Sequence, residues 1–129
     1  MSLSSAMRIS SSGMTAERFR MDVISMNIAG ADTMRTPQQD AYRRQDVILS
    51  GGEDGVRIVG TQRDNTELRP VYEPGNPNAD ASGFVYYSNV KPINEMVDMI
   101  GASRAYEANV AAFNSAKSMV RAALTIGRI

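Results

Sequence analysis

The sequence predicts an α+β fold in which two long amphipathic helices, one near each end, flank a small β-rich insert. Three observations predict it. Apolar residues recur at helical spacing in the first part of the chain, and an unbroken three-four spacing runs through the last part. Between them, turn-forming residues separate short runs rich in Val, Ile, Tyr and Phe. We therefore divide the chain into a helical segment 1–29, a β-rich insert 30–91 and a helical segment 92–129.

The first helix is expected over residues 2–29. Residues three, four or seven positions apart form its apolar stripe: Leu3, Met7, Met14, Met21, Ile24 and Ile28. Ser10 and Glu17 interrupt the same stripe, and Gly13 inside a helix costs about 1 kcal/mol relative to Ala. We therefore expect this helix to be weak in isolation.

The insert is expected to form a β-hairpin or a small sheet. Its turn signals are Thr36-Pro37, Gly51-Gly52, Gly55, Pro74-Gly75 and Asn76-Pro77. Strands are predicted at 45–49, 56–59, 68–72 and 84–87. Pro70 has no N–H to donate to a neighbouring strand, so its strand should lie at an edge.

The second helix is expected over residues 92–126. Residues of this helix that are spaced alternately three and four positions apart form a heptad seam, the pattern of a coiled coil. They are Met96, Met99, Ala102, Tyr106, Asn109, Phe113, Ala116, Val120 and Ala123. Pro92 suits a first helical turn, and Gly127 suits the position after the last. Asn109 is polar within the seam; it either fixes the register of a partner helix or marks a face turned to solvent.

Composition argues for protein partners and against catalysis. The chain has 14 basic and 14 acidic residues spread along its length, without the basic patch of a nucleic-acid binder. Because it has no Cys and no His, disulfides, Cys/His zinc sites and histidine general bases are excluded. No apolar run approaches the ~18 residues that span a bilayer, and the first residues do not resemble a cleavable signal peptide. We expect no enzyme activity, no cofactor, no metal and no direct membrane insertion.

Polar clusters in the insert are interpreted as solvated surface. Asn76, Asn78 and Asp80 have the one-three-five spacing of a calcium loop, but Ala81 and Tyr87 stand where such a loop needs Gly and a carboxylate. We therefore expect a turn there.

Two further charged groups receive the same interpretation. The carboxylates of Glu53, Asp54, Asp64 and Glu67 occur in polar or Gly-rich stretches and are expected to be solvated. Arg43-Arg44 is expected at an exposed strand start or in an ion pair with a neighbouring subunit, because one basic pair is weak support for nucleic-acid binding.

The two helical arms can either pack on each other as an antiparallel pair or associate with other chains. Both arrangements remain open from the residues alone. The second helix can be approached closely from several sides, because small residues lie on several of its faces: Ala102, Ala105, Ala108, Ala111, Ala112, Ala116, Ala122 and Ala123.

Three separated parts of the chain resemble the rod proteins of the bacterial flagellar basal body. The matching stretches are 11–18 and 21–29 near the start, 42–47, 55–59 and 72–77 in the middle, and 89–90, 95–100 and 103–110 near the end. The first is similar to the N-terminal box shared by flagellar axial proteins, and the others are similar to the short rod members of the proximal rod. That box usually reads Asn-Asn-Ile-Ala-Asn, and here Met26 and Gly30 replace two of its asparagines.

The resemblance implies a structural role. Family members polymerise into a hollow drive shaft that transmits motor torque to the hook and filament, with the terminal helices paired as coiled coils in the tube. It also implies copies of itself and other rod proteins as partners, membrane-ring and export-apparatus proteins at the base, and a periplasmic location reached by type III export without a cleaved signal. Another axial protein of the rod or hook region, and a cytoplasmic helical adaptor, are the alternatives.

The helix seams are the predicted polymerisation interface. Its residues are Leu3, Met7, Met14, Met21, Ile24, Asn27, Ile28, Met96, Met99, Ala102, Tyr106, Asn109, Phe113, Ala116, Val120 and Ala123.

Overall fold

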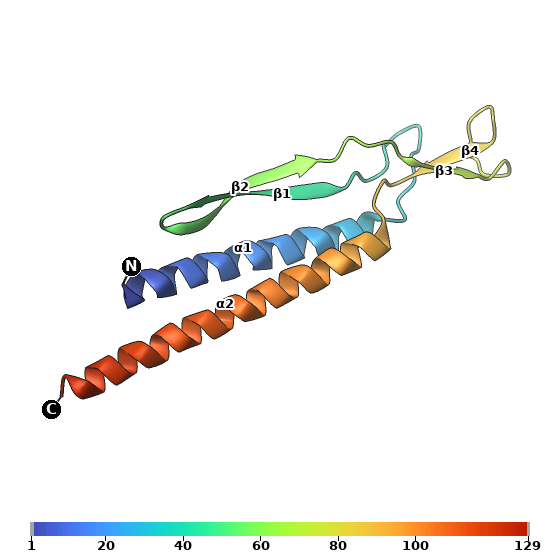
Figure 1. Ribbon diagram of the computed structural model, residues 1–129. Coiled ribbons are helices and arrows are strands. Elements are labelled where there is room, and N and C mark those ends of the chain that lie inside the picture. The colour runs from blue at the N-terminus through green and yellow to red at the C-terminus, as the bar shows by residue number, and fades with distance from the viewer. Residues whose placement is uncertain (1, 129) are drawn as a thin grey trace. The chain divides into compact units, whose positions relative to one another are not determined.

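The computed structural model describes residues 2–128 and confirms an α+β architecture (Figure 1). The elements in chain order are α1 (Leu3–Gly30), β1 (Gln45–Gly52), β2 (Gly55–Arg63), β3 (Arg69–Tyr72), β4 (Phe84–Tyr87) and α2 (Pro92–Ile126). The chain forms two compact units, and α1, the β1–β2 hairpin and α2 each contribute to both. Unit 1 contains the described residues 2–21, 47–60 and 99–128, and unit 2 contains 22–46 and 61–98.

The helix ends follow from local capping. Ser2 precedes α1, and its Oγ accepts the N–H of Ser5 at 3.1 Å, which satisfies one of the free donors of the first turn. At the other end of α1, the hydroxyl of Thr33 donates to the carbonyl of Gly30 at 2.8 Å. The second helix begins at Pro92 and ends just before Gly127, as the sequence predicts.

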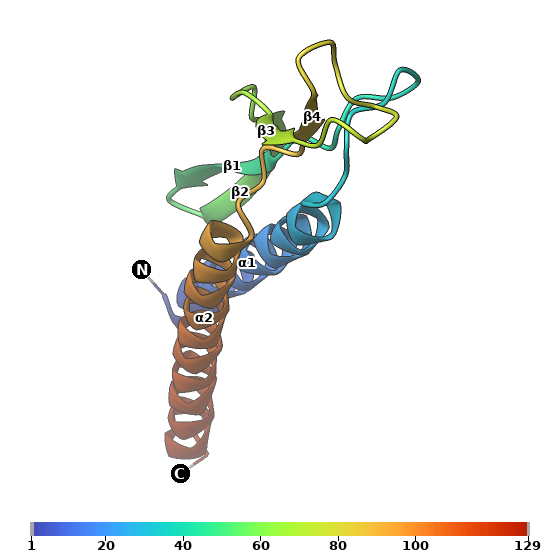
Figure 2. The ribbon, with the colours of Figure 1, turned by 90° about the vertical axis from the view of Figure 1, so that its right-hand side faces the viewer.

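In unit 1, α1 and α2 lie side by side and run in opposite directions (Figures 1 and 2). Small residues line their contact, since Ser10, Ala16, Ala102 and Ala116 are all buried. The Asn109 side chain of α2 packs directly against Gly13, since a Cβ on Gly13 would lie 2.7 Å from the side-chain amide atoms of Asn109. The intramolecular pair is thus the arrangement of a single chain, and Asn109 packs on Gly13 within it.

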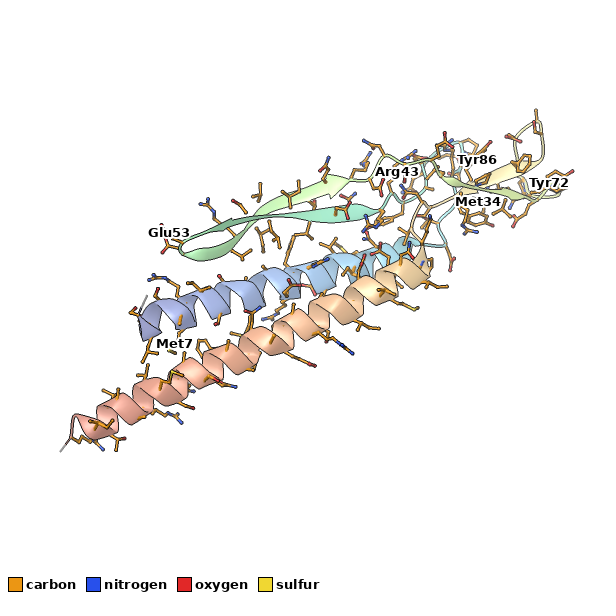
Figure 3. The ribbon with its side chains drawn as sticks, in the orientation of Figure 1. Met7, Met34, Arg43, Glu53, Tyr72 and Tyr86 are labelled. Atoms are coloured by element: carbon orange, nitrogen blue, oxygen red, sulfur yellow. The ribbon has the colours of Figure 1, made fainter. Side chains whose placement is uncertain are left out.

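The turn of the β1–β2 hairpin also belongs to unit 1. The sequence places a turn at Gly51-Gly52, but these residues continue β1, and the turn is made by Glu53 and Asp54 (Figure 3). Gly55 follows with a φ of 111°, a left-handed conformation that favours glycine. The turn therefore lies within the predicted stretch 51–55, but the assignment of Gly51 and Gly52 to it was wrong, because a glycine pair signals a bend without fixing which residues occupy its corner.

Ser12 anchors this hairpin on α1. Its Oγ donates to the carbonyl of Ile9 at 2.6 Å and accepts the backbone N–H of Val56 at 3.0 Å. Arg8 and Asp54 add an ion pair at 3.4 Å, but both side chains are well exposed, so it contributes little to stability.

In unit 2, β3 and β4 pair antiparallel, with Val71 opposite Val85. Residues 33–35 extend the sheet on the far side of β4, through a bridge between Met34 and Tyr87. This leaves β3 at the edge, which confirms the prediction from Pro70. The core of this unit is small and aliphatic, and its buried members are Val23, Ile24, Ala31, Ala41, Leu68, Val85 and Val90.

A loop of residues 73–83 joins β3 to β4, and a tight turn at its end leads into β4. Asp80 closes it, because its Oδ1 accepts the backbone N–H groups of Ser82 and Phe84, both at 2.9 Å. Tyr86 donates its hydroxyl to the other carboxylate oxygen of Asp80 at 3.1 Å. Tyr72 and Phe84 form an edge-to-face pair at this end of the sheet, where Figure 3 labels Tyr72 and Tyr86.

Candidate functional site

Asn27 is the centre of a buried polar joint in unit 2. Its amide nitrogen donates to the carbonyl of Gln45 at 2.9 Å and to Oε2 of Glu95 at 3.1 Å. Its amide oxygen accepts the hydroxyl of Tyr42 at 2.8 Å and the N–H of Gln45 at 3.0 Å. The side chain is 1% exposed, so all of its hydrogen-bonding capacity is used inside the protein. Asn27 therefore connects the end of α1 to the start of β1 and the first turn of α2.

Arg44 completes this joint, which we define as Asn27, Tyr42, Arg44, Gln45 and Glu95. The Nε of Arg44 donates to Oε1 of Glu95, whose side chain is only 1% exposed. A buried carboxylate is tolerated only when it is paired and hydrogen-bonded. Here Arg44 provides the opposite charge for Glu95, and Asn27 donates a further hydrogen bond to it. Burial would lower the pKa of Arg44, but its bond to Glu95 and the nearby carboxylates raise that pKa above its ordinary value.

Arg44 is surrounded by more negative charge than it can neutralise. Besides Glu95 it pairs with Asp46, with Asp64 at 3.6 Å and with Asp98 at 3.6 Å. These residues stand beside an open cleft of about 600 Å³, lined by Arg44, Asp64, Thr66, Glu67, Asn89, Lys91, Asn94, Glu95, Val97 and Asp98. We call this the carboxylate cleft. Arg44 and Lys91 are the basic groups there, against the five carboxylates of Asp46, Asp64, Glu67, Glu95 and Asp98, so the local charge is negative.

The end of α1 is closed by an aromatic contact. A Cβ on Gly30 would meet the ring of Tyr42 at 2.5 Å, so only glycine fits beneath this ring. Burial raises the pKa of Tyr42, with a smaller contribution from the charge of Glu95. The glycine that replaces an asparagine in the family box thus provides space for the tyrosine that bonds to Asn27.

Comparison with known proteins decides the family. The family described as "Flagella basal body rod protein" matches residues 7–35, and "Flagellar basal body rod FlgEFG protein C-terminal" matches 81–126. The chain is 42% identical to the flagellar basal-body rod protein FlgC of Borreliella burgdorferi, over 98% of both chains. It is 39% identical to the FlgC of Bacillus subtilis and 37% identical to that of Escherichia coli O157:H7, over 95% and 99% of this chain and 97% and 100% of those relatives.

This chain belongs to the FlgC family of flagellar basal-body rod proteins. It is a structural subunit of the rod, as the resemblance implies. The membership favours this role over a cytoplasmic adaptor, and the relatives are structural proteins rather than enzymes. Among residues 2–128, no helix combines the length and the apolar character needed to span a membrane.

The polar joint brings together three stretches that carry the family resemblance. Asn27 comes from 21–29, Tyr42, Arg44 and Gln45 from 42–47, and Glu95 from 95–100. These stretches are far apart in the sequence and meet in unit 2. In this rod protein the motifs therefore have a shared structural purpose, which is to fix the ends of two helices to one strand.

The predicted seam residues differ in exposure. Ile24, Asn27, Ala102 and Ala116 are buried, and Leu3, Met96 and Ala123 are exposed. The other members are partly buried: Met7, Met14, Met21, Ile28, Met99, Tyr106, Asn109, Phe113 and Val120. Figure 3 labels Met7 where α1 faces α2 in unit 1. Much of the seam is thus already covered within one chain.

Sequence reasoning missed the exposed apolar side chains toward both ends of α2, and it missed the role of Arg44. Large apolar side chains that lie outside the seam are strongly exposed: Ile93, Val97, Ile100, Met119, Leu124 and Ile126. Arg44 is not at an exposed strand start, because it is bound by carboxylates of its own chain. The only hint of this role in the sequence was that Arg44 lies near Tyr42 in the stretch 42–47 that resembles the family.

The stability of unit 2 is expected to fall in acid. Bonds from Arg35, from the N–H of Thr66 and from the N–H of Phe84 are the main causes that lower the pKa values of Asp40, Asp64 and Asp80. A carboxyl group with a lowered folded-state pKa adds stability above its unfolded pKa of about 4, and this is lost as the pH falls further.

The same unit should lose stability in alkali. Burial raises the pKa of Tyr42, and bonds to Asp80 and Glu73 raise those of Tyr86 and Tyr87. A phenol with a raised folded-state pKa adds stability below about pH 10 that is lost as the pH rises beyond it. Urea unfolding between about pH 2 and pH 11 should give a plateau with two falling limbs, and Asp80→Asn should flatten the acid limb. Stability that keeps rising below about pH 4 would contradict this assignment.

Proposed function

We propose that this rod protein polymerises with copies of itself and with other rod proteins into the proximal part of the rod. There it forms part of a hollow drive shaft that transmits motor torque to the hook and filament. Its contribution is mechanical, without catalysis, cofactor or metal. Family membership supports the rod, and the exposed apolar side chains of α2 support polymerisation.

The exposed apolar side chains of α2 carry the proposal, because a solvated helix gains no stability from them. Ile93 is 77% exposed, Ile100 is 57% exposed and Met119 is 57% exposed. Burying each such side chain against a neighbour contributes about 1.5–3 kcal/mol. We propose that segments 1–29 and 92–129 pair as coiled coils along the inside of the tube, with 30–91 as an outer layer.

The location follows from the same proposal. The subunit would reach the periplasmic rod through the flagellar export apparatus without signal cleavage, and would meet membrane-ring and export proteins at the base. Torque passes through many subunits in series, so each one must resist deformation between its helices. The buried joint around Asn27 is suited to that task, because it ties the ends of both helices to one strand of unit 2.

The test replaces exposed apolar residues by polar ones in a strain that lacks its own copy of the gene. Ile100→Asn combined with Met119→Asn should leave the monomer's circular dichroism spectrum and melting temperature unchanged, because both side chains are exposed. Swimming should be lost, and isolated basal bodies should lack a complete rod. Val59→Asn on the hairpin, at 64% exposure, is the matched control and should swim normally. Normal rods and full motility in the double variant would reject polymerisation through these side chains.

A further inference from the structure

The two ends of α2 have opposite chemistry. From Pro92 to Ser103 the helix contains Glu95 and Asp98 but no Lys or Arg. After Glu107 it contains no Asp or Glu, while Lys117, Arg121 and the following Arg128 are basic. The chain as a whole has no net charge, so this asymmetry is local and directional.

The acidic end offers a negatively charged cleft with an apolar rim. Arg44 faces four carboxylates, and Asp98, one of these, is 40% exposed and available to a second cation. Glu67 lines the same cleft and is exposed. Val97, which lines the cleft, and Ile93, one helical turn before it on the same face, are 62% and 77% exposed. The cleft thus has room and charge for a basic group, with apolar surface beside it.

The basic end of α2 is not covered by any of the residues 2–128. All residues from Arg121 to Arg128 are exposed, with Leu124 at 67%. Lys117, Arg121 and Leu124 follow i, i+4, i+7 spacing, so they share one face of the helix. This face combines positive charge with a large apolar side chain, the counterpart of the carboxylate cleft.

We propose that the C-terminal end of α2 of one copy docks on the carboxylate cleft of a second copy, an inference that rests on the proposed function as a polymerising rod subunit. Arg121 supplies the missing cation to Asp98 and Glu67, and Leu124 packs on Val97 at the rim. A guanidinium suits this role because it binds carboxylates through two parallel N–H donors.

The chemistry favours a second copy of this chain as the occupant. Both complementary surfaces belong to the same sequence, and they are different surfaces. A contact of that kind is heterologous, so repeating it adds subunits head to tail into a ring or an open helical assembly, rather than closing a symmetric dimer. It also gives the assembly a direction, since every subunit contributes one acidic and one basic end.

Engineered cysteines test this contact, because the chain has none of its own. Two differently tagged copies, Glu67→Cys and Arg121→Cys, are produced together in the strain lacking the native gene. Oxidation of isolated basal bodies should yield a mixed disulfide-linked dimer. Glu53→Cys, an equally exposed glutamate at the hairpin turn, replaces Glu67→Cys in the control and should give about tenfold less mixed dimer.

A charge swap examines the same contact without cysteine. Arg121→Glu should reduce incorporation into the rod about tenfold, which corresponds to about 1.4 kcal/mol. Adding Glu67→Arg to the same chain should restore it, because each interface again pairs opposite charges, whereas adding Glu53→Arg should not. Normal rods with no mixed dimer, or normal incorporation of Arg121→Glu, would overturn this contact and leave the rod function standing. Failure of the unmodified chain to form rods would instead reject the proposed function.

Discussion

Replacing Arg44 by Met is expected to lower the free energy of unfolding of unit 2 by about 3–5 kcal/mol, the cost of leaving a buried carboxylate unpaired. Glu95 is 1% exposed and would keep only the amide of Asn27 as a partner. Asp46, Asp64 and Asp98 would also lose the cation that separates them from one another. Urea unfolding followed by circular dichroism would measure this loss.

Two further variants identify the cause. Adding Glu95→Gln to Arg44→Met removes the uncompensated charge while keeping an acceptor for Asn27, so a large part of the stability should return. Arg43→Met is the matched control, because the carboxylate partner of Arg43 is the half-exposed Asp40. Its cost should be about 1 kcal/mol or less. Equal losses for Arg43→Met and Arg44→Met would show that the buried charge is not the reason.

Replacing Gly13 by Ala is expected to destabilise unit 1 by about 1–2 kcal/mol, although alanine favours helices by about 1 kcal/mol. The new methyl group would stand 2.7 Å from the amide atoms of Asn109. Asn109 would have to move and would lose its 3.0 Å bond to the carbonyl of Ala105. Thermal unfolding of the purified chain would measure the change.

Gly101→Ala is the control, since it lies in α2 with open space where its methyl group would be. It should stabilise the chain by about 0.5–1 kcal/mol, opposite in sign to Gly13→Ala. Asn109→Ala should relieve the crowding when it is combined with Gly13→Ala. Stabilisation by both glycine replacements would mean that α1 and α2 do not approach closely at Gly13.

The helices were predicted almost to the residue, because their periodicity extends over many turns and Pro92 and Gly127 mark the ends of α2. The strands were also predicted, but Gly51 and Gly52 were assigned to the turn rather than to β1. Local patterns give element type well, whereas the corner of a hairpin depends on cross-strand register.

The joint could not be predicted, because its members are distant in the sequence. Asn27 and Glu95 are separated by 68 positions, and Glu95 looked like an ordinary acidic residue of a first helical turn. The heptad seam was recognised, but spacing alone does not say which neighbour covers it. Gly13 is an example of what spacing alone cannot predict. The sequence showed that this glycine weakens the helix, but its contact with Asn109 was visible only in the structure.

The joint around Asn27 also sets an order of events in folding. Synthesis proceeds from the N-terminus, so α1 and Arg44 exist well before Glu95 has been made. Until then Asn27 and Arg44 have no buried carboxylate to bind, and the end of α1 has no attachment to α2. The joint in unit 2 therefore forms late. Until Glu95 has been synthesised, α1 and the segment around Arg44 are present but are not fixed to each other through its carboxylate.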